Sequence, residues 1–179
     1  MGRDIAVSAI GHLIFIWNGM ELIAEKLGKT DKLDRLRYVR EDGSFTACSM
    51  PRQGILPHDL IHYVVESQLQ LKDGFTGLIA QGAEAAFAAQ LSHGLAQKMA
   101  GTEAIQVEAI VEALQTQLWA GQFSMEDFVE GVQTACLARD QPTFDFGGTN
   151  MPPCLYEKAG ELNTQWATVP YYGSLTLEF

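Results

Sequence analysis

Residues 56–66, Leu-Pro-His-Asp-Leu-Ile-His-Tyr-Val-Val-Glu, form the stretch around which the fold is organised. Pro57 is typical of the first turn of a helix, where its missing N–H costs nothing. Apolar residues recur at helical spacing and form one arc: Leu60, Ile61, Val64, Val65, Leu69 and Leu71. We therefore predict an α-helix that begins near Pro57 and ends before Gly74, a helix-stop signal.

This helix carries His58, His62 and Glu66 at four-residue intervals. At about 100° per residue the three side chains fall within an arc of about 80°, at the margin of the apolar arc. Two histidines at i and i+4 can hold one metal ion, because their rings meet above the same helical turn. The helix therefore carries a candidate site at the boundary between core and solvent.

The pattern His58-Asp59-x-x-His62 resembles the His-Glu-x-x-His motif of zinc peptidases, with Asp59 in place of the glutamate. The resemblance implies Zn²⁺ or another divalent metal on the two histidines, and Asp59 as general base or as an orienting residue. Aspartate is one methylene shorter, so its reach to a metal-bound water is reduced. The third ligand is open between Glu66 on the same helix and Glu84 on the next predicted helix.

A structural interpretation competes with the metal site. His58 can orient the start of the helix, and His62 can form an ordinary i,i+4 pair with Glu66. His93 is either a further ligand or a solvated side chain. Two functions therefore stay open, with enzyme activity undecided. One is a zinc-like metal-binding hydrolase, and the other is a non-catalytic interaction or regulatory module that forms a homo-oligomer.

Length and composition restrict these functions. The 179 residues, 47% of them hydrophobic, fit a single globular domain over 1–179. The net charge of −10 argues against a nucleic-acid-binding surface and against adhesion to anionic lipid. Three cysteines without a Cys-x-x-Cys pattern indicate reduced thiols and a cytoplasmic protein. The apolar run 5–17 is too short to span a membrane.

Strand signals flank a helical middle. Residues 35–40 and 44–50 alternate in polarity around Glu41-Asp42-Gly43, which contains the Asp-Gly signal of a β-hairpin. Residues 174–179 also alternate, and we predict a terminal strand that pairs with this hairpin. Residues 5–17 fit a strand or a helix, whereas for 20–27 we predict a helix ended by Gly28.

The remaining chain is predicted to be helical with one long loop. The alanine-rich residues 75–99 predict one long helix, and Thr102 is expected to cap the next helix, which ends at Gly121. Ser124 begins a capping box and a further helix, and residues 155–166 predict the last one. Residues 141–153 are rich in Gly and Pro and predict a loop. The predicted fold class is α+β, with helices packed on a small antiparallel sheet.

From the hairpin through residues 56–66 to Gly74-Phe75, the chain resembles a group of uncharacterised bacterial proteins. These proteins share a hairpin, a Leu-Pro-His-Asp-Leu-x-His helix and an ending like Gly173-Ser174-Leu175-Thr176-Leu177 after Trp166. The N-terminal segment and the loop 140–153 lie outside the likeness. The resemblance implies the hairpin–helix architecture and a bacterial cytoplasmic origin, and it implies no activity.

Overall fold

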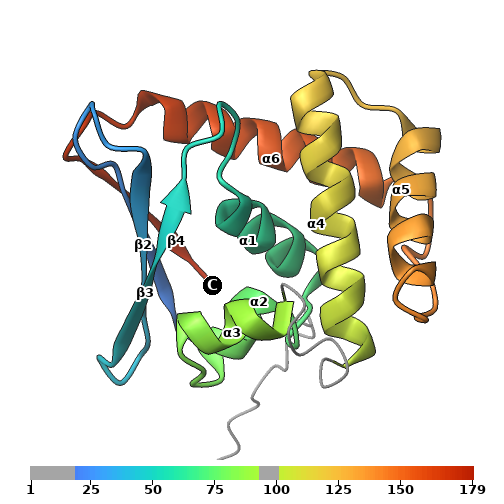
Figure 1. Ribbon diagram of the computed structural model, residues 1–179, viewed down its shortest axis with the longest axis horizontal. Helices are drawn as coiled ribbons and strands as arrows, with labels where there is room; N and C mark the ends of the chain where they lie inside the picture. Colours follow the sequence, from blue (N-terminus) through green and yellow to red (C-terminus); the bar gives the residue numbers. More distant parts are fainter. Residues whose placement is uncertain (1–18, 93–100) are drawn as a thin grey trace, which may run out of the picture.

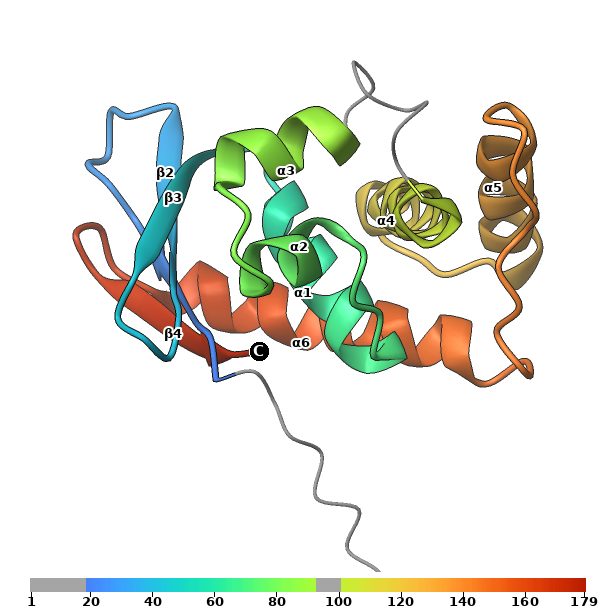
Figure 2. The same cartoon turned by 90° about the horizontal axis from the view of Figure 1, so that it is seen from below.

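The computed structural model describes residues 19–92 and 101–179 (Figure 1). Within these ranges the chain forms six helices and one four-stranded antiparallel sheet, which confirms the predicted α+β class. The sheet lies at one end of the molecule and helices α4 and α5 lie at the other. Helix α6 runs between the two ends, as Figure 2 also shows.

The sheet has the strand order β3-β2-β1-β4. Its strands are β1 (Glu21–Glu25), β2 (Leu33–Val39), β3 (Phe45–Pro51) and β4 (Ser174–Glu178). The predicted hairpin is β2–β3, and Gly43 in its turn has φ +81°, a conformation that favours glycine. The terminal strand is confirmed, but its predicted partner is wrong. β4 pairs with β1, with Leu22 opposite Leu177, because β1 lies between β4 and the hairpin.

The helix predicted for residues 20–27 is wrong, because this segment contains strand β1. Met, Glu, Leu and Ala are strong helix formers, which explains the error. Met20, Leu22 and Ala24 are buried at every second position, and β1 pairs with a strand on each side. Tertiary pairing therefore overrides local propensity here. The open question of residues 5–17 lies outside the described residues.

From residue 58 onward the described helices follow the predicted order, except that two helices replace the one predicted for residues 75–99. They are α1 (His58–Leu69), α2 (Phe75–Ala80), α3 (Ala85–Ser92), α4 (Thr102–Ala120), α5 (Met125–Leu137) and α6 (Met151–Thr168). The Ser124 side chain accepts the N–H of Asp127, as the capping box predicted. Thr102 is the first residue of α4 and Gly101 occupies the cap position, so the predicted threonine cap is wrong.

The long helix predicted for residues 75–99 is also wrong where it can be followed, since α2 and α3 are separate. The helical conformation is interrupted at Gly82, which has φ +107°. Arg40 of the hairpin donates hydrogen bonds to the carbonyl oxygens of Ile79 (2.8 Å) and Ala83 (2.7 Å). The break therefore supplies acceptors for a hairpin side chain. His93 lies outside the described residues.

Helix α1 occupies the centre of the molecule, between α6 and α2 in both views (Figures 1 and 2). Its apolar arc packs in one core with Leu36 of β2 and with Ile110 and Leu114 of α4. Because α1 packs against α2, α4 and α6, polar residues at the margin of its apolar arc lie in the interior. None of the helices in the described ranges is both long and apolar enough to cross a membrane.

Candidate metal centre

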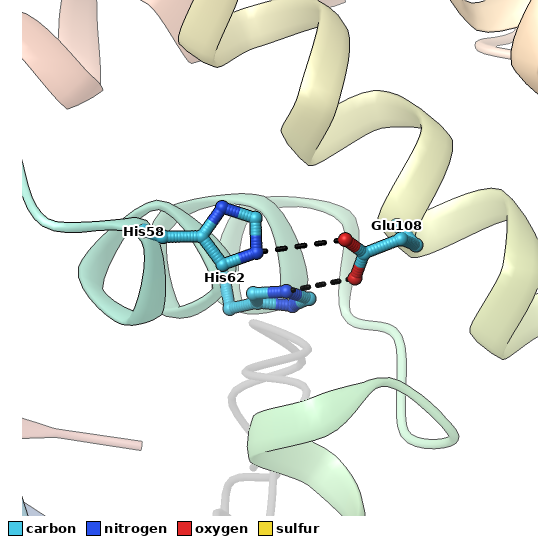
Figure 3. Close-up of side chains that lie close together, drawn as sticks. All are labelled: His58, His62 and Glu108. Atoms are coloured by element: carbon cyan, nitrogen blue, oxygen red, sulfur yellow. Dashed lines mark ion pairs between the residues drawn. The ribbon is translucent and has the colours of Figure 1, made fainter. Parts of the chain in front are cut away.

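Two histidines of α1 face one glutamate of α4 (Figure 3). Nε2 of His58 lies 3.5 Å from Oε1 of Glu108, and Nε2 of His62 lies 3.2 Å from Oε2 of the same carboxylate. One ligand atom from each residue can be chosen so that all three lie within 4.8 Å of one another. The two helices therefore bring together donors that are 46 positions or more apart in sequence.

The ring nitrogens that face Glu108 are buried, and only His58 of the three residues has a partly exposed side chain. The side chain of His62 is 1% exposed and that of Glu108 is 5% exposed, whereas that of His58 is 21% exposed. Charges on the first two residues are therefore held in a low-dielectric environment, where their interaction is stronger than in water. The exposed part of His58 does not include Nε2, which is buried like Nε2 of His62.

The second ring nitrogen of His62 is bound by Glu66. Nδ1 of His62 lies 3.1 Å from Oε1 of Glu66, which also accepts the N–H of Thr76 at 3.0 Å. Oε2 of Glu66 accepts the N–H of Gly77 at 2.7 Å. A carboxylate in these contacts is an acceptor only, so Nδ1 of His62 carries a hydrogen. The nitrogen that remains for another partner is Nε2, which faces Glu108.

A chain of amides fixes the hydrogen on His58 in the same way. Nε2 of Gln53 donates a hydrogen bond to the carbonyl oxygen of Leu56 (3.0 Å). Oε1 of Gln53 therefore accepts a hydrogen bond from Nε2 of Gln115 (2.8 Å). Oε1 of Gln115 then faces Nδ1 of His58 at 3.2 Å. Because a backbone carbonyl can only accept, this order of donors places a hydrogen on Nδ1 of His58. Both histidines therefore direct Nε2 toward Glu108.

A positive charge is required between Nε2 of His62 and the carboxylate of Glu108, since two lone pairs repel. In the absence of metal that charge is a proton. Burial acts to lower the pKa of His62, but hydrogen bonds to Glu108 and Glu66 outweigh it and raise the pKa to about 10. Burial acts to raise the pKa of Glu108, yet its bonds to His58 and His62 hold that pKa below its usual range. Metal-free His62 is therefore an imidazolium at neutral pH.

The spacing of the donors also suits a metal ion. A tetrahedral Zn²⁺ with bonds of about 2.05 Å separates its ligand atoms by about 3.3 Å. The two nitrogen–oxygen distances at Glu108, 3.5 and 3.2 Å, run to different oxygens, and one ligand atom from each of the three residues lies within 4.8 Å of the other two. Each histidine has its Nδ1 bound by a fixed acceptor, the arrangement that orients metal-ligating histidines in proteins. The residues present therefore fit a divalent ion.

The predicted site residues have three different positions. His58 and His62 belong to the group, whereas Glu66 binds His62 and two backbone amides and is not one of the three donors that converge. Glu84 is exposed at the start of α3, where its carbonyl accepts the N–H of Ala88, and the structure does not bring it to the group.

Asp59 interacts electrostatically with two residues of the sheet. Burial, and after it the charge of Asp59, raises the pKa of Cys48 on β3 to about 12. The same carboxylate contributes to the raised pKa of Tyr38 on β2, where burial is the largest cause. Its role as a general base stays a prediction.

Glu108 is the donor that the sequence analysis missed. It lies in α4 among buried apolar residues such as Val107 and Val111, and it is itself buried. Gln115 follows seven residues later, two helical turns away on the same stripe, and both side chains reach His58. The usable signal was this polar pair at the margin of an apolar arc, opposite a helix with two histidines.

A small pocket lies at the start of α1. It has a volume of about 200 Å³, and its lining includes Gln53, Pro57, Trp166 and Tyr171. Gln53 therefore touches the pocket and also begins the amide chain that ends at His58. None of the three converging donors lines this pocket.

We found no match to this chain among protein-family models, curated proteins or solved structures. The chemistry open to the centre follows from its own donor set. Two imidazole nitrogens and one carboxylate form the His₂Glu set found in catalytic zinc sites, where a fourth position holds water or substrate.

Proposed function

We propose that this chain binds a divalent metal ion, with Zn²⁺ the best fit, through Nε2 of His58, Nε2 of His62 and the carboxylate of Glu108. The observation that carries the proposal is the convergence of the two nitrogens on one carboxylate, at 3.5 and 3.2 Å. Fixed acceptors hold both Nδ1 hydrogens, so neither ring needs to turn before a metal ion binds.

We further propose that the centre serves a metal-dependent hydrolase. Three protein ligands leave a position for water on a four-coordinate ion, and such an ion generates a nucleophile at neutral pH. The chain's own contribution is to hold the three donors and to keep His62 and Glu108 away from bulk solvent. The side chain of His58 is the most exposed of the three, although its Nε2 is buried. Asp59 is the predicted base, and its role rests on the motif alone.

A second candidate is a non-catalytic module in which the histidines are structural. It is favoured by the raised pKa of His62, whose charged ring would tie α1 to α4 through Glu108 and to α2 through Glu66. Trp119 on α4 and Leu137 on α5 are large exposed apolar side chains that suit a homo-oligomer. Light scattering that finds a strict monomer would count against this candidate.

The two candidates are separated by metal analysis of protein purified without an affinity tag and then equilibrated with Zn²⁺ or Mn²⁺. We expect bound metal in the wild-type chain and none in the variant His58→Ala/His62→Ala. A wild-type protein that is isolated without metal and binds neither added ion would remove the metal proposal.

We also propose a bacterial, cytoplasmic protein, on the likeness described for residues 56–66 and the strands around them. Cys48, Cys136 and Cys154 are free thiols in the structure, which suits a reducing compartment. Thiol titration of the denatured protein, isolated without reductant, would test this: three reactive thiols are expected, and a disulfide would oppose it.

A further inference from the structure

Glu66 is a fully buried carboxylate one helical turn after His62 on α1. All three of its hydrogen bonds use it as an acceptor: from Nδ1 of His62 at 3.1 Å, from the N–H of Thr76 at 3.0 Å and from the N–H of Gly77 at 2.7 Å. A buried carboxylate needs such partners, because desolvation is costly. Both carboxylate oxygens of Glu66 therefore already accept hydrogen bonds.

The connection between α1 and α2 is shaped around this carboxylate. A Cβ atom at Gly74 would lie 2.6 and 2.8 Å from the two oxygens of Glu66, closer than real contacts allow. Gly74 has φ −78°, which any residue can adopt, so glycine is required there for space alone. The backbone of residues 74–77 thus forms a fixed support for Glu66.

We propose that Glu66 is a positioning residue of the metal centre and not one of its ligands, an inference that rests on the proposed metal binding. Glu66 holds the Nδ1 hydrogen of His62, which turns Nε2 toward Glu108 and makes that nitrogen a stronger donor. To become a ligand, Glu66 would have to leave the amides of Thr76 and Gly77.

The Nδ1 atoms of the two histidines have different acceptors. His62 has a charged acceptor, Glu66, which is fixed by backbone amides, whereas His58 has the neutral amide of Gln115. A carboxylate polarises an imidazole more strongly than an amide does. Loss of Glu66 should therefore weaken metal binding more than loss of Gln115.

The experiment compares Zn²⁺ affinity, by competition with a chromophoric chelator, in the wild type, Glu66→Gln and Glu103→Gln. Glu103 is a matched control: its Oε1 accepts the N–H of Lys72 (2.7 Å) and of Asp73 (2.8 Å) in the same α1–α2 connection. In Glu66→Gln the new NH₂ group must face an N–H donor. We expect affinity about 10- to 100-fold weaker for Glu66→Gln, and unchanged for Glu103→Gln.

Each outcome separates the two proposals. A wild type that binds no Zn²⁺ ends the metal proposal itself. A wild type that binds, with Glu66→Gln equally tight, leaves the metal site standing and overturns the positioning role. With Co²⁺ as the probe, we expect Glu66→Gln to keep the visible absorption spectrum of the wild type, and a changed spectrum would make Glu66 a ligand.

A measurement on the wild type covers the case in which Glu66→Gln does not fold. Imidazole ¹⁵N NMR of the Zn²⁺-loaded protein reports which ring nitrogen carries the hydrogen. We expect hydrogen on Nδ1 and metal on Nε2 for His62. Metal on Nδ1 of His62 would overturn the inference, because that atom faces Glu66.

Discussion

Nε2 of His62 and Oε2 of Glu108 lie 3.2 Å apart in the interior, where neither side chain is more than 5% exposed. The contact joins α1 to α4 (Figure 3). A proton on Nε2 of His62 makes this contact an ion pair. A metal ion can bind between the same two atoms only after that proton has left.

The stability of the metal-free protein should fall at alkaline pH. The folded pKa of His62, about 10, exceeds the ordinary value of 6.5, so its contribution is complete below pH 6.5 and is lost as pH rises toward 10. The folded pKa of Glu108 is lowered, so its contribution to the free energy of unfolding is present above pH 4.5 and is lost as the pH falls further. Thermal midpoints with a chelator present should fall from pH 6.5 to 10. The same fall in His62→Gln would contradict this origin.

Metal stabilisation should have the opposite dependence on pH. Zn²⁺ must displace the Nε2 proton of His62, so its affinity should rise tenfold per pH unit below the pKa of that ring. With excess metal this is about 1.4 kcal/mol of added stability per unit. The check is the thermal midpoint from pH 5 to 8, with Zn²⁺ and with a chelator. Curves that coincide throughout, or that separate more at pH 5, would contradict it.

Glu108→Gln should destabilise the metal-free protein at pH 7 by about 3 kcal/mol, because it leaves a buried imidazolium with Glu66 as its remaining charged partner. Glu112→Gln is the matched control on the same helix. Glu112 pairs with Arg139, but its side chain is 42% exposed, so its loss should cost under about 1 kcal/mol. Urea unfolding with a chelator measures both. Equal costs would argue against a charged His62.

Gly74→Ala should destabilise the protein by about 1–3 kcal/mol and weaken Zn²⁺ binding, since the new methyl group would push against Glu66. Gly160→Ala on α6 is the control, because a Cβ there meets nothing within 4 Å. It should stabilise the protein by about 0.5–1 kcal/mol through helix propensity. Denaturant unfolding and Zn²⁺ titration of both variants check this. A Gly74→Ala protein that matches the wild type would contradict the support described for Glu66.

Local signals predicted much of the architecture. The Asp-Gly turn predicted β2–β3, the spacing of apolar residues predicted α1 and α4, and alternation predicted β4. β1 was missed because strong helix formers occupy Met20–Glu25, and only its neighbours β2 and β4 make it a strand. The partner of β4 depended on the same missed strand.

The site was predicted where it is local and missed where it is not. His58 and His62 belong to one helix, so their proximity follows from helical geometry. Glu108 lies 46 residues after His62 on another helix, and the packing of α4 on α1 that places it there is a tertiary feature. Glu66 lies on the predicted stripe, but its contacts with Thr76 and Gly77 depend on the turn at Gly74.

The most direct test of the metal centre is calorimetric titration of the chelator-treated wild type with Zn²⁺ at neutral pH, beside His58→Ala, His62→Ala and Glu108→Gln. The structure predicts one ion per chain for the wild type, with proton release that shows as a buffer-dependent heat. Each of the three variants should bind much more weakly while keeping the wild-type circular dichroism spectrum. A wild type that takes up no Zn²⁺, or variants that bind it as the wild type does, would contradict the assignment of His58, His62 and Glu108 as its ligands.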